Sequence, residues 1–259
     1  MINYLINVVY ALFNRLMKLR PIRLFSERYP VVFNFFIHRF SVKIFTGLPL
    51  TMLATALLAN LMLIMDFTPD VINSKEFVVA DRQVAQWLYL LRTPVLAAAF
   101  SWLTLLCNIE FVIALSALAA IIFIVKRKFD CLVAMLIALA GCGITIYVSK
   151  NIFQIDRPFQ MAYTYEYSFS FPSGHATIAV ALYGSLFYFL VRNTASLKLR
   201  FWVFNLALAF ALLIGFSRLY LCVHYLSDVL GGYMLGSVWL ILSISVFEWM
   251  RYSKNRIAL

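Results

Sequence analysis

Near the C-terminal end of the chain, a cation, an imidazole and a carboxylate lie between two long apolar runs. His224 and Asp228 are four residues apart, so on a helix they would share one face. A carboxylate beside an imidazole selects one tautomer and leaves the other ring nitrogen free to attack or to accept a proton. Arg218 offers a forked donor that suits a phosphate-like anion. The stretch from Ser217 to Asp228 is therefore the first candidate for a reactive site.

Two further polar clusters stand at the ends of other apolar runs. One pairs Lys150 with Arg157, and the other is the run Pro-Ser-Gly-His that ends at His175. Each cluster alone has an ordinary structural interpretation: the cations could extend to the membrane surface, Ser173 could cap a helix, and the histidine–aspartate pair could be interfacial. Three cations, two histidines and a carboxylate at one membrane face need a common ligand, and a phosphate group is the obvious one.

The composition is that of an integral membrane protein. Of the 259 residues, 64% are hydrophobic and 13% are charged, whereas a soluble domain is roughly half apolar and a quarter charged. The net charge of +11 could suggest a nucleic-acid partner. In so apolar a chain, basic loops at a cytoplasmic membrane face explain this charge better. We therefore expect a lipid bilayer as the environment and no nucleic-acid partner.

Long apolar runs predict an all-α bundle of six membrane-spanning helices in one domain at 44–259. The spans are expected at Phe45–Met65, Phe111–Val125, Cys131–Ser149, Ala176–Val191, Phe201–Phe216 and Asp228–Met250. In the last span, Gly232 and Gly236 would allow another helix to approach closely. Most of the 22 Lys and Arg lie in segments that face the cytoplasm if both termini do. This orientation gathers all three polar clusters at the outer face.

Three other segments are less regular. Residues 1–43 predict one or two basic amphipathic helices on the cytoplasmic surface, and the alternative is a short additional span at residues 4–17. Residues 66–110 predict an acidic outer loop, in which the apolar piece Pro94–Cys107 forms a helix that packs at the outer interface or leads into the second span. Alternating aromatic residues at 162–171 predict an interfacial aromatic belt, in preference to a strand-like lid.

Taken together, the polar clusters resemble the three signatures of the type 2 phosphatidic acid phosphatase family. These are K-x6-R-P from Lys150 to Pro158, P-S-G-H from Pro172 to His175, and S-R-x5-H-x3-D from Ser217 to Asp228. Every signature position matches, and the related vanadium haloperoxidases and glucose-6-phosphatases share the site. The resemblance implies a six-helix membrane bundle that hydrolyses phosphate esters with no metal ion or other cofactor. It covers the chain from about residue 45 to 250 and leaves the first 43 residues outside.

The resemblance also implies which residues bind the phosphate group. Lys150, Arg157 and Arg218 would contact its oxygens and balance the charge of the transition state. Ser173 and Gly174, at the start of a helix, would complete the anion site with their backbone N–H groups. No further cluster of histidines and carboxylates is left to bind a metal ion.

The same resemblance assigns the catalytic roles. His224 would be the nucleophile that forms a phosphohistidine, and Asp228 would orient it. His175 would protonate the leaving oxygen and then activate water for the second step. Ser217 would add a supporting hydrogen bond.

These features predict an enzyme that hydrolyses a lipid phosphate or pyrophosphate at the outer face of a bacterial inner membrane. The lipid could stay in the bilayer while its head group reaches the cations. Undecaprenyl pyrophosphate, phosphatidylglycerophosphate, phosphatidate and lipid A phosphates are candidates, and we favour a polyprenyl pyrophosphate. The alternative is a phosphotransferase with a second lipid as acceptor. A transporter would place ionisable residues near the midplane, and a haloperoxidase does not suit a lipid-facing site; protein partners are not indicated.

Overall fold

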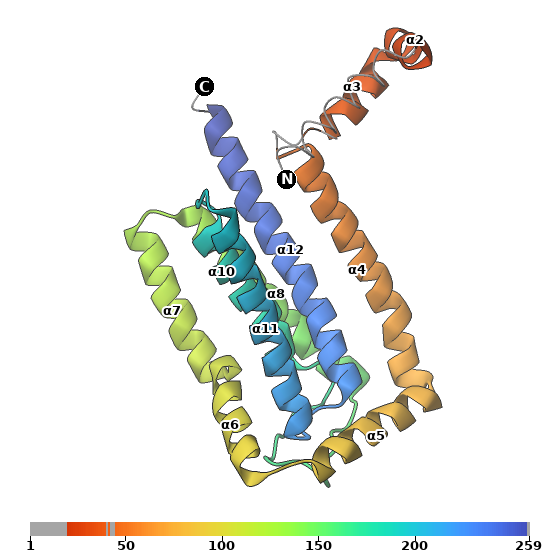
Figure 1. The fold of residues 1–259 in the computed structure, drawn as a ribbon, viewed down its shortest axis with the longest axis vertical. Helices are drawn as coiled ribbons and strands as arrows, with labels where there is room; N and C mark the ends of the chain where they lie inside the picture. Colours follow the sequence, from red (N-terminus) through yellow and green to blue (C-terminus); the bar gives the residue numbers. More distant parts are fainter. Residues whose placement is uncertain (1–19, 40, 42–44, 258–259) are drawn as a thin grey trace. The chain divides into compact units, whose positions relative to one another are not determined.

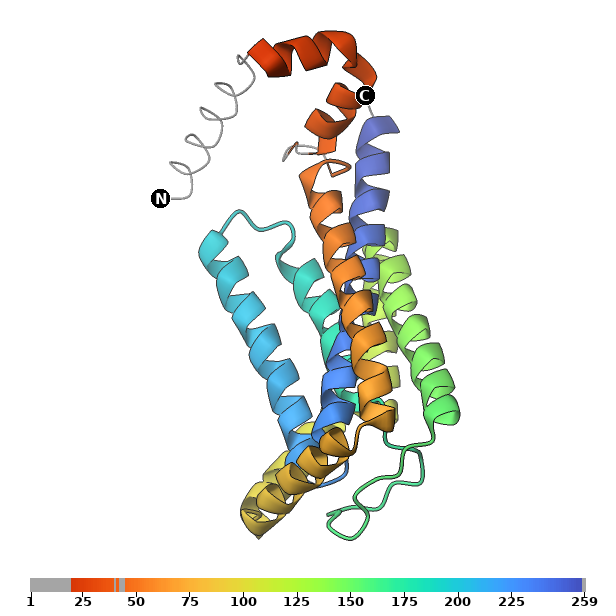
Figure 2. The same ribbon diagram turned by 90° about the vertical axis from the view of Figure 1, so that its right-hand side faces the viewer.

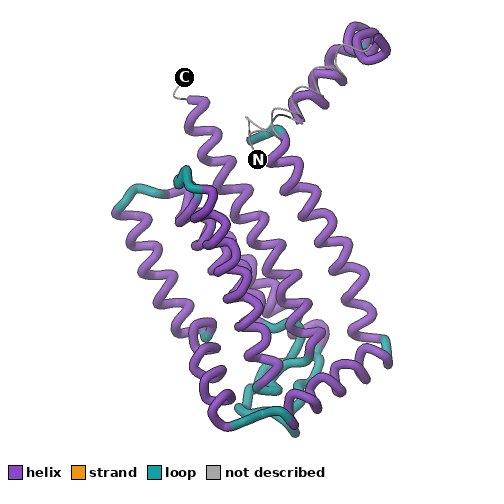
Figure 3. The backbone as a smooth tube through the Cα atoms, in the orientation of Figure 1, coloured by secondary structure: helices purple, strands orange, loops and turns teal. Residues whose placement is uncertain are grey.

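The computed structural model describes residues 20–39, 41 and 45–257, and every regular element in this part of the chain is a helix (Figures 1 and 3). The predicted all-α fold is confirmed. The chain divides into two compact units, Met1–Ala54 and Thr55–Leu259. The boundary falls within the first long helix, α4 (Leu48–Asn73).

The described residues of the first unit include two short helices, α2 (Arg20–Arg28) and α3 (Pro30–Arg39). Proline suits the first position of α3, because its missing N–H would have no intrahelical partner there. In α2, Arg23 forms an exposed ion pair with Glu27 one turn later, at 3.0 Å. These helices agree with the predicted helical character of this segment, whereas the alternative span at residues 4–17 lies outside the described residues. The cytoplasmic location of the segment stays a prediction.

Five helices in the described part of the chain are long and apolar enough to cross a membrane. They are α4, α8 (Phe129–Phe153), the composite helix Gly174–Val191, α11 (Leu197–Tyr220) and α12 (Leu226–Ile257). The composite helix consists of α9 (Gly174–Ile178), the π-helical turn η2 (Ala179–Tyr183) and α10 (Gly184–Val191). All five coincide with predicted spans, and the remaining predicted span is the shorter apolar helix α7 (Ile109–Val125).

The acidic loop predicted at 66–110 is wrong, because most of this stretch is helical. Helix α4 continues through Asp66 and Asp70, and α5 (Lys75–Leu90) begins directly after its N-cap Ser74. Acidic side chains are unfavourable in a bilayer, but they do not break a helix whose backbone hydrogen bonds are satisfied. The acidic residues therefore indicate where the apolar run ends, and the helix continues beyond them.

The apolar piece at Pro94–Cys107 is helical, as predicted. It forms α6 (Pro94–Thr104) followed by the short 3₁₀ turn η1 (Leu105–Cys107). The axes of α5 and α6 bend by 118° where they meet. By length and composition this bent pair could be one broken span, which would bring the number of candidate spans among the described residues to six.

Helix α12 is the central element of the second unit. It packs against α8 and against the composite helix, as the two perpendicular views show (Figures 1 and 2). A Cβ atom at Gly232 would lie 2.7 Å from Ser173 O, and one at Gly236 would lie 2.6 Å from Thr177 O. The predicted close helix approach at these glycines is confirmed. It holds the start of α9 directly against the start of α12.

Two connections meet at one end of the second unit (Figure 3). They are residues 154–173, between α8 and α9, and the turn 221–225, between α11 and α12. Gln154 ends α8 with a left-handed backbone, φ 48°. The long connection contains no strand, so the strand-like lid is not formed. Tyr165 and Tyr167 are 70% and 95% exposed, and their place in an aromatic belt stays a prediction.

Candidate active site

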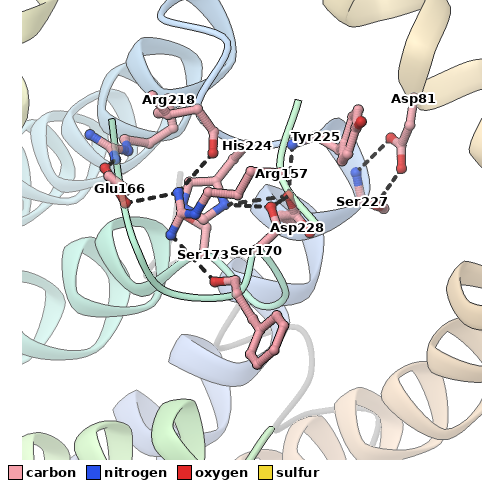
Figure 4. A network of polar contacts seen from close by, with 12 residues as sticks. Asp81, Arg157, Glu166, Ser170, Ser173, Arg218, His224, Tyr225, Ser227 and Asp228 are labelled. Atoms are coloured by element: carbon pink, nitrogen blue, oxygen red, sulfur yellow. Dashed lines mark hydrogen bonds and ion pairs between the residues drawn. The ribbon is translucent and has the colours of Figure 1, made fainter. Parts of the chain in front are cut away.

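His224 and Asp228 form a buried pair where α12 begins. His224 precedes the helix, Asp228 lies in its first turn, and their side chains are 1% and 0% exposed. His224 Nδ1 lies 3.3 Å from Asp228 Oδ2. The same carboxylate oxygen accepts hydrogen bonds from the Tyr225 N–H at 2.7 Å and from the Ser170 hydroxyl (Figure 4). The predicted pairing of imidazole and carboxylate is present, although the histidine is not itself helical.

A buried arginine determines which ring nitrogen of His224 is free. Arg157 Nη1 lies 3.1 Å from His224 Nε2, and a guanidinium group can only donate. Nε2 therefore carries the lone pair, and Nδ1 carries the proton that faces Asp228. A nucleophile at Nε2 would require this tautomer.

The side chain of Arg157 is held in place largely by backbone carbonyls. Its Nε donates to Ser168 O at 2.7 Å, and its Nη1 donates to Val223 O at 2.8 Å. Lys150 Nζ donates to Ser168 Oγ at 2.9 Å, and Arg157 Nη2 donates to the same hydroxyl at 3.1 Å. Ser168 thus joins the two cations of the first predicted cluster.

Arg218 comes from the last turn of α11 and meets Arg157 through a shared carboxylate. Its Nη1 donates to Thr104 Oγ1 at 3.0 Å, and its Nη2 pairs with Glu166 Oε1. The second oxygen, Glu166 Oε2, lies 2.8 Å from Arg157 Nη1. One carboxylate from the long connection therefore bridges two guanidinium groups from different parts of the chain (Figure 4).

Unpaired polar atoms gather at the same place. Among the described residues, four buried side-chain polar atoms have no hydrogen-bond partner, and three of them are Ser173 Oγ, Arg218 Nε and Asp228 Oδ1. Leaving such an atom unpaired costs about 1–3 kcal/mol, so each calls for an explanation. The hydroxyl of Ser173 and the N–H of Arg218 Nε can both donate to an anion.

The start of α9 offers the unpaired hydroxyl of Ser173. The backbone N–H of Ser173, which was expected to bind the anion, donates instead to Asp228 O at 2.9 Å. Ser173 is the N-cap residue, but its side chain makes no capping hydrogen bond, which argues against the ordinary interpretation of this serine as a helix cap. A Cβ atom at Gly174 would meet no other atom closer than 3.9 Å. The backbone at the N-terminus of a helix attracts anions.

His175 follows in the first turn of α9 and contacts a residue that the sequence did not indicate. Its Nε2 lies 2.9 Å from Asn108 Oδ1. Asn108 is the N-cap residue of α7, so its position is tied to the start of that helix. The contact holds the imidazole ring of His175 in one orientation.

The surroundings of His224 favour its neutral form. The pKa of His224 lies well below its usual value of 6.5, because of burial first and then the positive charges of Arg157, Arg218 and Lys150. Burial also lowers the pKa of Arg157, and the negative charges of Glu166 and Asp228 oppose that shift. A neutral imidazole keeps its lone pair available at neutral pH.

Comparison with known proteins shows the family of the chain. Residues 131–252 match the family model of the PAP2 superfamily. Phosphatidylglycerophosphatase B from Bacillus subtilis is 35% identical over 159 residues, which are 61% of this chain and 78% of the relative. The chain belongs to the PAP2 superfamily. It is a multi-pass membrane protein and an enzyme of the lipid phosphatase class.

Two other PAP2 proteins are similar. An undecaprenyl-diphosphatase from Sulfolobus acidocaldarius is 30% identical over 133 residues, which are 49% of this chain and 60% of the relative. The crystal structure of a PAP2-type phosphatidylglycerolphosphate phosphatase from Bacillus subtilis superposes with a TM-score of 0.68 at 28% identity. The superposition covers 73% of this chain and 94% of that one.

Most of the predicted PAP2 site residues come together. The contacts above link Lys150, Arg157, Arg218, His224 and Asp228. The hydrogen bond from Ser173 N to Asp228 O joins Ser173, and with it the adjoining Gly174 and His175, to this group. Ser217 is different, because its hydroxyl donates to Ile214 O in its own helix. The hydroxyl proton is used within α11, and a supporting hydrogen bond to the site stays a prediction.

Six residues whose polar side chains contact the PAP2 signature segments were missed by sequence reasoning. They are Asp81, Thr104, Asn108, Glu166, Ser168 and Ser170. Asp81 on α5 accepts a hydrogen bond from the Ser227 N–H at 3.0 Å and another from its hydroxyl, at the start of α12. Of these, only Glu166 could have been noticed in the sequence, since it is the single acidic residue between the end of the first signature at Pro158 and the start of the second at Pro172.

Proposed function

We propose that the protein removes a phosphate group from a membrane lipid through a phosphohistidine on His224. The observation that carries the proposal is the hydrogen-bonded state of the His224 ring. Nδ1 faces Asp228, whereas Nε2 presents its lone pair beside Arg157. Arg157, Arg218 and Lys150 supply the positive charge that would stabilise the phosphoryl group in transit.

In the first step, the lone pair of His224 Nε2 attacks phosphorus, and the bond from phosphorus to the lipid oxygen breaks. His175 gives a proton to that oxygen, so the lipid leaves as an alcohol or as a monophosphate. The imidazolium that forms on His224 keeps its proton on Nδ1, directed at the Asp228 carboxylate, which stabilises the positive charge. Asn108 keeps the His175 ring oriented during the transfer.

In the second step, His175 takes a proton from a water molecule, and the oxygen of that water attacks phosphorus. The bond from phosphorus to Nε2 of His224 breaks, and the electron pair returns to the ring. Inorganic phosphate is released, and both histidines regain their starting states. The unpaired donors Ser173 Oγ–H and Arg218 Nε–H would hold phosphate oxygens in both steps.

The substrate belongs to the lipids with a terminal phosphate or diphosphate. One relative is a phosphatidylglycerophosphatase and another is an undecaprenyl-diphosphatase, and both head groups end in the phosphate that this site would bind. We retain a polyprenyl pyrophosphate as the favoured substrate and phosphatidylglycerophosphate as the next candidate. The site lies at the ends of α8, α11 and the composite helix, where a lipid head group can reach it from the bilayer.

We also propose that this end of the bundle faces the periplasm of a bacterial inner membrane. The opposite end carries the basic turn Lys126–Lys128 and the basic residues Arg192, Lys198 and Arg200 around the α10–α11 link, which favours a cytoplasmic location. A membrane-impermeant phosphate ester supplied to intact spheroplasts should be hydrolysed. Hydrolysis only after the membrane is opened would contradict this orientation.

The first experiment is phosphate release by the purified protein in detergent, with a chelator present, across a panel of lipid phosphates and diphosphates. We expect free phosphate from at least one lipid, and no requirement for a divalent cation. Phosphate transferred to a second lipid would instead identify a phosphotransferase. Activity that disappears with chelator and returns with magnesium would contradict the proposed mechanism.

A further inference from the structure

Glu166 occupies the two arginines that would bind phosphate. Its Oε1 pairs with Arg218 Nη2, and its Oε2 lies 2.8 Å from Arg157 Nη1 (Figure 4). The side chains of Arg157 and Arg218 are 2% and 3% exposed. Two buried positive charges need a counter-charge when no substrate is bound. Glu166 supplies it.

We propose that Glu166 is a further active-site residue, which competes with phosphate for Arg157 and Arg218 and releases them when a phosphate group binds. This inference rests on the proposed function. In the empty enzyme the carboxylate keeps two like-charged groups side by side. When a phosphate group enters, its oxygens take over the same donors.

The geometry of the bridge supports this role. A carboxylate and a phosphate group each offer oxygens that accept from guanidinium N–H groups, so one can take the place of the other. Each oxygen of Glu166 binds a different arginine, as two oxygens of one phosphate group would. Glu166 Oε2 also approaches Arg157 Nη1, the atom that contacts His224 Nε2. The carboxylate therefore lies beside the proposed nucleophile.

The hydrogen bonds of Arg157 Nη1 show that the present arrangement is crowded. This nitrogen has two protons, but three acceptors lie around it: Val223 O at 2.8 Å, Glu166 Oε2 at 2.8 Å and His224 Nε2 at 3.1 Å. One of the three must be poorly satisfied. Attack on phosphorus would remove Nε2 from the set, and departure of Glu166 would free a proton for a phosphate oxygen.

Glu166 is also placed so that it can leave. Its side chain is 27% exposed, and it lies on the long connection between two backbone attachments. Tyr163 N donates to Leu221 O at 2.9 Å, and Ser170 N donates to Ile155 O at 2.7 Å. Rotation of the Glu166 side chain toward water would leave both attachments intact. A phosphate group could then enter without a change in the helices.

The test is Glu166→Gln, which keeps the shape of the side chain and removes its charge. Without the competing charge, inorganic phosphate should bind more tightly, and its inhibition constant should fall about tenfold, the usual worth of one charge-assisted hydrogen bond. The KM for lipid should fall as well. The kcat should fall or stay constant, because the phosphate product leaves more slowly. Protection of the protein from thermal unfolding by inorganic phosphate gives the same affinity without turnover.

Two further variants make the result decisive. Glu166→Asp has a shorter side chain that cannot bridge both arginines, so it should also bind phosphate more tightly than the wild type, by a smaller factor. Glu248→Gln removes the charge from the other arginine-bound glutamate of the second unit and should leave the inhibition constant of phosphate unchanged.

The outcomes separate this inference from the proposed function. If the wild type releases phosphate from lipids and both Glu166 variants bind phosphate equally or less tightly, Glu166 is a permanent support of the arginines and the competition is refuted. If the wild type neither releases phosphate nor is protected by it, the proposed function fails and this inference fails with it. Tighter binding in both variants supports the competition.

Discussion

Two glutamates bind arginines in the second unit, and their surroundings differ in kind. Glu248 lies on α12 and is 8% exposed. Its carboxylate accepts hydrogen bonds from two nitrogens of Arg192 and, at 2.7 Å, from the hydroxyl of Tyr188. Glu166 lies on a connection without regular structure, and its two oxygens bind two different arginines. Glu248 follows Asp228 by 20 residues on one helix, so the two clusters are about 30 Å apart.

The difference between the clusters lies in what they leave unpaired. Around Glu248, the carboxylate, the guanidinium group and the phenol bind one another, and none of their atoms is among the unpaired buried atoms of the described residues. Around Glu166, Ser173 Oγ, Arg218 Nε and Asp228 Oδ1 have no partner. The first arrangement stabilises the fold. The second leaves polar atoms unpaired that could bind a ligand, at a cost in stability. This difference in role between the two clusters can be tested.

The largest expected effect is on turnover at the His224 end. His224→Gln removes the proposed nucleophile but keeps a polar side chain of similar size. We expect kcat to fall on the order of 10⁴-fold, with little change in thermal stability. Phosphate release and the midpoint of thermal unfolding, measured on the same preparation, check this. Turnover within tenfold of the wild type would overturn the nucleophile assignment.

The next effect should appear at the Glu248 end and should be one of stability. Glu248→Gln breaks the pair with Arg192, whose side chain is 36% exposed. Because that exposure weakens the interaction, the free energy of unfolding should fall by about 2 kcal/mol rather than the larger cost of a fully buried pair. The kcat of the folded fraction should not change. If Glu248→Gln loses turnover while it stays folded, the Glu248 cluster contributes to catalysis, and the proposed separation of stability from catalysis is wrong.

Two glycines give a matched pair on a smaller scale. A Cβ at Gly232 would lie 2.7 Å from a backbone oxygen, whereas one at Gly174 would make only ordinary van der Waals contact with Ile146, at 3.9 Å. Gly232→Ala should therefore destabilise the fold by about 1–3 kcal/mol through overpacking. Gly174→Ala should leave stability unchanged but raise the inhibition constant of phosphate by about tenfold, because the methyl group would meet the ligand. Equal stability of the two variants would contradict this reading of the packing.

The sequence predicted the helices well because they depend on local patterns. Apolar runs gave six segments that correspond to five long helices and α7, and the glycines at 232 and 236 indicated the close packing on α12. The exception was residues 66–110, where acidic residues suggested a loop. In a membrane protein, polarity reports contact with lipid, and a helix can continue beyond the lipid.

The signatures likewise predicted the cations and histidines of the site, but not the residues that hold them. Asn108 binds His175, and Asp81 binds the first turn of α12, from helices far away in the sequence. Neither has a motif, because a single polar side chain between apolar runs looks the same whether it is free or bound. Glu166 was visible as an isolated carboxylate, but its position between two arginines depends on how residues 154–173 fold.

The smallest expected effect is a pH dependence that belongs to the catalytic end alone. The pKa of His224 lies well below 6.5 in the folded protein, because of burial and the neighbouring cations. The unfolded chain would bind a proton near pH 6.5, so it holds more protons than the folded protein below that pH. The stability contributed by neutral His224 is therefore complete above pH 6.5 and is lost as pH falls toward its folded pKa. At pH 5.5 the loss of unfolding free energy should be about 1.4 kcal/mol relative to pH 8.

His224→Gln cannot take up this proton, so its thermal midpoint should decline less than that of the wild type over the same range. Glu248→Gln should decline in parallel with the wild type, because its site contains no histidine; a parallel decline in His224→Gln instead would mean that His224 is accessible to protons in the folded enzyme.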